Sequence, residues 1–228
     1  MAKHYVIRAI EVLKANGAKP ELQDGKLTFN TRPTWGHAWR AIKHDSRMNC
    51  VLWKTVIYQA ICCEQLPKEE RFVPIGCQNC YKIVVRPKTW PEFLKLEQYM
   101  IEFDHPSKLG VEVRRTVKAL YGSYFYNRGL EEGRACYEKI AKTWPTAILK
   151  RGCTELELMH GPSDKWQITD LQREIEAEVE KSIRVPVQTY LQDEKELNKI
   201  HRRWENFAWK FDPTYEGEDL FPKYVTYH

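Results

Sequence analysis

The sequence predicts an α+β fold that is predominantly helical, with small β elements around a CxxC metal site and a helical hairpin at the C-terminus. Apolar residues recur at helical spacing in most of the chain. Short β-prone segments flank Cys77 and Cys80. Two amphipathic stretches follow Gly161, so we predict a core domain over residues 1–160 and a helical region with a docking tail over residues 161–228.

The first third of the chain predicts three helices and one β-hairpin. Apolar residues at helical spacing indicate a helix over residues 4–15. Residues 21–29 form a hairpin pattern, because Asp24-Gly25 is a favourable two-residue turn between β-prone segments. We expect a basic helix over residues 32–47, and an apolar helix from about residue 49 to residue 63.

The middle of the chain alternates between β-prone and helical patterns. Residues 71–86 predict a strand, the CxxC loop and a second strand. Thr89 and Pro91 are typical of a helix start. Residues 110–114 fit a strand or a helix start equally well. The glycines and aromatic residues of 121–134 predict either a backbone that closely approaches the metal centre or a ligand, or a loop whose aromatic rings pack in the core. Residues 155–158 alternate as a strand would.

The composition limits the class of protein. The chain has 228 residues and a net charge of +5, and it is long enough to bury a sizeable core. Its longest apolar runs are shorter than the roughly 20 residues of a membrane span. Charged residues interrupt the short apolar run at the N-terminus, unlike in a secretory signal. We therefore expect a cytoplasmic protein without a membrane partner.

The seven cysteines predict a metal centre. In a reducing compartment, a CxxC motif with further scattered cysteines favours metal binding over a disulfide framework. The tight loop after Gly76 can direct both thiols of the motif toward one point. The isolated Cys136 and Cys153 lie near glycines and arginines, outside the clearest apolar runs. We predict that four thiols bind the metal, namely Cys77, Cys80, Cys136 and Cys153.

The remaining cysteines, Cys50, Cys62 and Cys63, belong to the apolar helix and are assigned to core packing. One close pair and two isolated cysteines suit a [4Fe–4S] cluster, while structural Zn²⁺ more often takes two close pairs. We expect the iron–sulfur cluster, with Zn²⁺ as the alternative. Ligation by His105 or His160 would favour zinc. A redox dithiol normally opens a helix after a strand, whereas β-forming residues follow this motif.

The charge distribution fits two interpretations, a polyanionic partner at the basic end of the chain or an ordinary solvated surface. Residues 1–60 contain ten Lys and Arg against four Asp and Glu. Aromatic rings and arginines near residues 121–134 could stack on bases and contact phosphates. We therefore predict a metal-centre protein that binds or helps process nucleic acid. The candidate contacts are Arg40, Lys43, Arg47, Arg114, Arg115, Tyr124, Tyr126, Arg128 and Arg134.

Two other functions fit the same sequence. The chain could be an accessory subunit with a structural Zn or Fe–S site, which docks on a partner or a second copy through its C-terminal helices. It could also be a small redox enzyme that uses the cluster. The sequence contains no flavin, nicotinamide or phosphate-loop motif. We assign no catalytic residue and leave enzymatic activity open.

Overall fold

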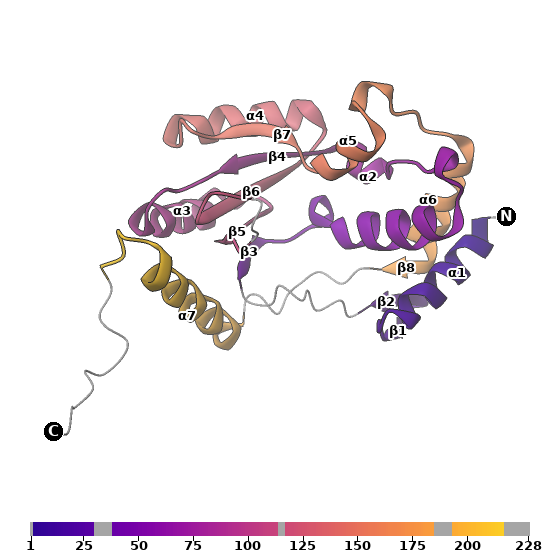
Figure 1. Ribbon diagram of the computed structural model, residues 1–228, viewed down its shortest axis with the longest axis horizontal. Helices are drawn as coiled ribbons and strands as arrows, with labels where there is room; N and C mark the ends of the chain where they lie inside the picture. The colour runs from indigo at the N-terminus through magenta and orange to yellow at the C-terminus, as the bar shows by residue number, and fades with distance from the viewer. Residues whose placement is uncertain (1, 30–37, 114–116, 185–192, 217–228) are drawn as a thin grey trace, which may run out of the picture.

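The computed structural model describes residues 2–29, 38–113, 117–184 and 193–216. The fold is α+β, as predicted, and helices account for more of these residues than strands do (Figure 1). The main sheet has the strand order β3-β5-β6-β4-β7, and a smaller sheet has the order β1-β2-β8. The main strands are β3 (Trp39–Lys43), β4 (Cys80–Val85), β5 (Ser107–Val111), β6 (Tyr121–Arg128) and β7 (Ile148–Arg151).

The main sheet contains two interlocked β-α-β units. Strand β6 lies between β4 and β5, and strand β4 lies between β6 and β7, with antiparallel pairing throughout. Helix α3 (Trp90–Phe103) connects β4 to β5, and helix α4 (Gly129–Thr143) connects β6 to β7. This connectivity is that of a ferredoxin-like split β-α-β arrangement. The strand β3 extends the sheet beyond β5.

Each face of the main sheet contributes to a separate hydrophobic core. Helices α3, α4 and α7 (Glu194–Phe211) pack with Ile83, Val85 and Phe125 in one core. Helices α1 (Ala2–Ala15) and α6 (Asp170–Ser182) form the other core with the π-helix η2 (Val51–Cys63). The sheet residues of this second core include Cys80, Val84, Tyr124 and Tyr126. The alternation of side chains along β4 and β6 explains this division.

Several predicted elements are confirmed. The hairpin consists of β1 (Pro20–Gln23) and β2 (Lys26–Phe29), and the turn residues Asp24 and Gly25 have φ of 49° and 74°. The helices expected near residues 4–15 and 49–63 are α1 and η2. The Thr89 side chain accepts a hydrogen bond from the Glu92 N–H and caps α3. The hairpin turn and the helix cap could be predicted because each depends on residues that are close together in the sequence.

Other predictions are wrong. Residues 39–43 form strand β3 where a helix was expected, and residues 121–134 form strand β6 and the start of α4. Residues 71–74 do not form the strand expected before the CxxC motif. The short helix α2 (Ile75–Gln78) precedes Cys80 instead. Residues 154–160 form α5 (Thr154–His160) where a strand was expected. In each case the pattern is short or buried on both sides, so its period does not identify the element.

The two C-terminal helices do not pair with each other as a hairpin. Helix α6 packs with α1, whereas α7 packs on the opposite face of the sheet and lies at the other end of the molecule (Figure 1). Strand β8 (Ile183–Arg184) also pairs with β2, so elements on both sides of residue 160 share the same cores. The expected docking tail lies outside the described residues. The remaining short elements are η1 (Ser46–Met48), η3 (Lys68–Glu70) and η4 (Ser163–Lys165).

No helix in the described ranges is long and apolar enough to cross a membrane.

Candidate functional site

Three of the four predicted cysteines come together beside the main sheet. Cys77 lies in α2, Cys80 opens β4, and Cys153 directly precedes α5. The thiols of Cys77 and Cys80 each interact with the Cys153 thiol. Cys50 lies at the N-terminus of η2 and interacts electrostatically with all three. The cluster of Cys50, Cys77, Cys80 and Cys153, here called the thiol cluster, therefore joins three distant segments of the chain.

Cys136 is not part of the thiol cluster. It lies on α4 in the core on the opposite face of the sheet, where it interacts with Asn127. Cys136 therefore lies on the other face of the sheet from Cys77, Cys80 and Cys153, whereas Cys50 lies on the same face as these three. The sequence assigned Cys50 to core packing because it adjoins an apolar helix, the usual place for a packing cysteine.

Two glycines allow the thiol-bearing loops to approach each other. The Gly152 N–H donates a hydrogen bond to the Cys80 carbonyl at 2.8 Å. A Cβ atom on Gly76 would lie 1.9 Å from Cε2 of Trp53, so only glycine lets α2 pack so closely on η2. Arg151 donates from Nη1 to the Gln78 carbonyl, and its guanidinium lies 4.8 Å from the ring centroid of Tyr81. These contacts fix the loop that contains Cys77 and Cys80.

Interactions within the cluster shift the pKa values of its thiols in opposite directions. Interaction with Cys77 and Cys80 lowers the pKa of the Cys153 thiol. The same interactions, together with burial, raise the pKa values of Cys77 and Cys80. Burial also raises the pKa of Cys50.

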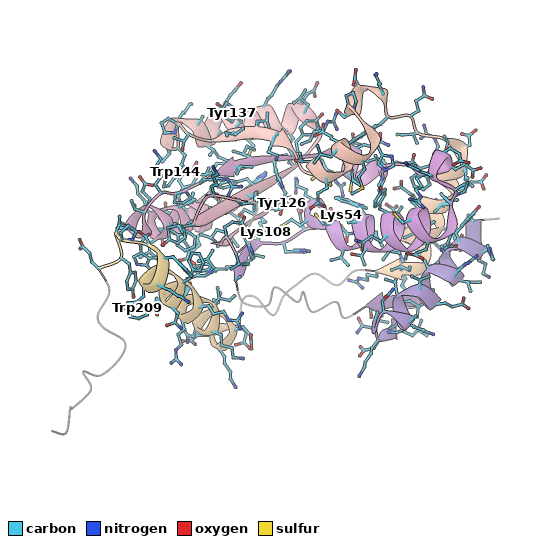
Figure 2. All side chains as sticks on the ribbon, viewed as in Figure 1. Lys54, Lys108, Tyr126, Tyr137, Trp144 and Trp209 are labelled. Atoms are coloured by element: carbon cyan, nitrogen blue, oxygen red, sulfur yellow. The ribbon has the colours of Figure 1, made fainter. Side chains whose placement is uncertain are left out.

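Lysine side chains surround the thiol cluster. Lys54, Lys82 and Lys108 interact electrostatically with Cys50, and Lys54 and Lys82 also interact with Cys153. Lys54 forms an ion pair with Glu155. Figure 2 shows Lys54, Lys108 and Tyr126 near the junction of η2 and the main sheet. Positive charge at this position offsets the negative charge of buried thiolates.

The described residues contain no group of three or more His, Cys, Asp and Glu side chains arranged to hold a metal ion. The two histidines considered as ligands have other partners. The His105 ring is 2.8 Å from the Tyr126 carbonyl, and the His160 ring is 2.8 Å from the Tyr58 hydroxyl. The metal centre thus remains a prediction.

The sheet face beside the cluster carries stacked rings and lysines. The Trp39 and Tyr124 rings stack at 5.4 Å. The Lys82 Nζ is 4.5 Å from the Tyr124 centroid, and the Lys108 Nζ is 5.3 Å from the Trp39 centroid. Tyr124 and Tyr126 are each only 5% exposed. A nucleobase therefore cannot stack on these two tyrosines, and Trp39 is the more accessible ring.

Carboxylates pair with three of the basic residues predicted to contact nucleic acid. Arg40 pairs with Glu97, and Lys43 pairs with Asp104. Arg47 pairs with both Asp45 and Glu132. Arg134 is exposed on α4. Arg114 and Arg115 lie outside the described residues.

A pocket of about 500 Å³ adjoins the thiol cluster and includes Cys80 in its wall. Two of the predicted contacts, Arg47 and Arg128, lie in this wall together with Arg173 from α6. Arg173 was missed because it belongs to the polar face of an amphipathic helix, which gives no functional signal. The other lining residues are Trp53, Ile75, Gly76, Asn79, Asn127, Glu176, Ala177 and Glu180.

Comparisons with protein-family models, with curated proteins and with solved structures found no match.

Proposed function

We propose that the chain is a metal-centre protein that binds or helps process nucleic acid. The convergence of four thiols and three lysines beside one face of the main sheet is the observation that supports the metal centre best. The proposed ligands are Cys50, Cys77, Cys80 and Cys153. Four sulfur donors suit both Zn²⁺ and an iron–sulfur cluster.

The position of the CxxC motif favours a metal centre over a redox dithiol. Cys77 lies in the short α2 and Cys80 opens strand β4. In thioredoxin-like proteins, the motif instead lies near the start of a helix that follows a strand. Burial of four thiolates without a cation would also be unfavourable. A bound cation would offset most of this charge, and the nearby lysines would offset part of the remainder.

Two observations favour different metals. The spacing of one pair and two isolated cysteines along the chain favours a [4Fe–4S] cluster. The interaction of Cys153 with both Cys77 and Cys80 favours Zn²⁺, because a tetrahedral ion with bonds of about 2.3 Å holds its sulfurs roughly 3.8 Å apart. A cluster would require the same sulfurs to lie farther apart. We retain the cluster as the first expectation and Zn²⁺ as the alternative.

Metal analysis of protein purified under anaerobic conditions tests the centre. A brown protein that contains iron and sulfide, with a broad absorption shoulder at roughly 400 nm, supports the cluster. One zinc per chain without iron supports the alternative. A protein that folds fully and contains no metal overturns the proposed centre.

The nucleic-acid part of the proposal depends on positive charge. Lys82, Lys108 and Lys150 alternate with rings on one sheet face, and Lys150 interacts electrostatically with Lys82 and Tyr124. Fluorescence anisotropy with single-stranded RNA and DNA at several salt concentrations tests this part. Absence of binding at low salt overturns it.

The exposed apolar side chains of α5 and α7 favour a second function, that of an accessory subunit. Leu158 and Met159 on α5 are 83% and 62% exposed, and Phe211 on α7 is 51% exposed. Neighbouring exposed apolar residues can mark a surface that docks on another protein. Light scattering tests self-association. A strictly monomeric chain that binds nucleic acid would favour the first function.

A further inference from the structure

We infer that the pocket beside Cys80 binds a single nucleotide and holds its phosphate between Arg128 and Arg173. This inference rests on the proposed nucleic-acid function and specifies where one nucleotide of a strand is bound. The pocket volume of about 500 Å³ lies within the range of small-molecule sites.

The two arginines come from different parts of the fold and converge on the pocket. Arg128 ends β6, and Arg173 lies near the start of α6. Both side chains are on exposed residues, and no carboxylate of the described chain forms an ion pair with either guanidinium. A guanidinium binds phosphate oxygens through two parallel hydrogen bonds. These two groups are therefore available to an anionic ligand.

Glu132 orders the arginine side of the pocket. Its carboxylate accepts hydrogen bonds from Arg47 Nε at 2.9 Å and from the Arg128 N–H at 2.6 Å. Asp45 binds the same Arg47 side chain. Arg47 thus lies in the wall as a positioned cation, and the backbone of Arg128 is held beside it. A site whose charges are already ordered loses less entropy when a ligand binds.

The other wall offers groups suited to a base or sugar. The Glu176 carboxylate accepts hydrogen bonds from the Ile75 N–H at 2.9 Å and from Gln172 Nε2 at 2.8 Å. Asn79 adds an amide, and Trp53 and Ile75 add apolar surface. A carboxylate and an amide can recognise the donor and acceptor edge of a base. Inorganic phosphate would leave this wall without a ligand, which favours a nucleotide.

Isothermal titration calorimetry with ribonucleoside 5′-monophosphates, the matching nucleosides and inorganic phosphate tests the inference. We expect at least one monophosphate to bind about tenfold more tightly than its nucleoside and than phosphate, because each lacks one set of contacts. Equal affinity for a monophosphate and its nucleoside overturns the phosphate assignment. Equal affinity for the monophosphate and inorganic phosphate overturns the nucleotide assignment.

The double variant Arg128→Gln/Arg173→Gln should bind the monophosphate at least about tenfold more weakly, since two charge-assisted contacts are lost. The control Arg202→Gln removes an exposed arginine on α7, outside the pocket, and should bind as the parent does. Circular dichroism establishes that each variant is folded. Unchanged affinity in the folded double variant overturns the inference.

Binding of a longer oligonucleotide separates this inference from the proposed function. A parent that binds oligonucleotides but no monophosphate retains the function and loses the pocket assignment. A parent that binds monophosphates but no oligonucleotide retains the pocket and loses the nucleic-acid function.

Discussion

Gly152 lies directly against Cys80. A Cβ atom at position 152 would stand 2.2 Å from Cys80 Sγ and 3.4 Å from the Cys80 carbonyl oxygen. The close approach of the Cys153 loop to β4 therefore requires glycine at position 152. Any larger side chain must displace the Cys80 thiol from the thiol cluster.

Gly152→Ala should destabilise the fold by about 1–3 kcal/mol, because an added methyl group overpacks this contact. The variant should also lose most of its metal if the proposed centre is present. Urea unfolding and metal analysis measure the two effects. Gly133→Ala is the matched control, since its Cβ would meet the flexible end of Leu149 at 3.0 Å. Wild-type stability and metal content in Gly152→Ala would show that the loops need not approach so closely.

If the proposed metal centre is present, Cys50→Ser and Cys153→Ser should each release most of the metal, because both thiols belong to the thiol cluster. Cys136→Ser should retain it, because Cys136 lies in the core on the other face of the sheet. The cost of Cys136→Ser should be about 1–3 kcal/mol of stability, as for a polar group buried without a full set of partners. Metal content per chain is the measurement. Loss of metal in Cys136→Ser with retention in Cys50→Ser would restore the ligand set expected from the sequence.

Lys108→Gln/Lys150→Gln should reduce nucleic-acid binding on the sheet face that carries the stacked rings of Trp39 and Tyr124. Each phosphate contact contributes about 0.7 to the slope of log affinity against log salt for a single strand, so the slope should fall by about 1.4. Anisotropy titrations at four salt concentrations measure this slope. Lys139→Gln, an exposed change on α4, is the control. An unchanged slope in the double variant would exclude this face as the binding surface.

Glu97→Gln should lower stability by about 2–4 kcal/mol at neutral pH, because it leaves the Arg40 guanidinium without its carboxylate partner. Arg40 Nη1 lies 2.5 Å from Glu97 Oε1, and His201 Nε2 lies 3.0 Å from the same oxygen. Chemical denaturation measures the loss.

The effect of Glu97→Gln should depend on pH. Burial alone would raise the pKa of Glu97, but the hydrogen bonds from His201 and Arg40 outweigh burial and lower it. A carboxyl group with a lowered pKa in the folded state stabilises the fold above its unfolded pKa of about 4.3. That contribution is lost as the pH falls through the lower folded value. The parent and the variant should therefore converge in stability in acid, and a constant difference at every pH would contradict the assignment.

Local chemistry made part of the fold predictable. The turn Asp24-Gly25 and the Thr89 cap depend on residues next to each other in sequence, and the structure contains both. Strand β3 was mistaken for part of a helix because Trp39 and its neighbours suit either period over five residues. Strand β6 was mistaken for irregular backbone because both its faces are buried, which removes the alternation that identifies a strand.

The site was predictable only in part for a related reason. The spacing of Cys77 and Cys80 indicates a shared position, but the choice between Cys50 and Cys136 depends on which face of the sheet each helix covers. That choice is made by tertiary packing, which single-sequence patterns do not specify. Likewise, Arg40 on β3 pairs with Glu97 on α3. Arg40 was predicted from the sequence as a basic contact, because the pairing of residues so far apart in the chain depends on the fold.

The thiol cluster also has a consequence for the order of folding during synthesis. Cys50 and the CxxC motif leave the ribosome well before Cys153, and strand β7, which pairs with β4, is made late as well. Closing such long loops makes folding slow. Cys77 and Cys80 are therefore synthesised long before Cys153, the residue with which both of them interact. The thiol cluster can close only after nearly the whole main sheet has been made.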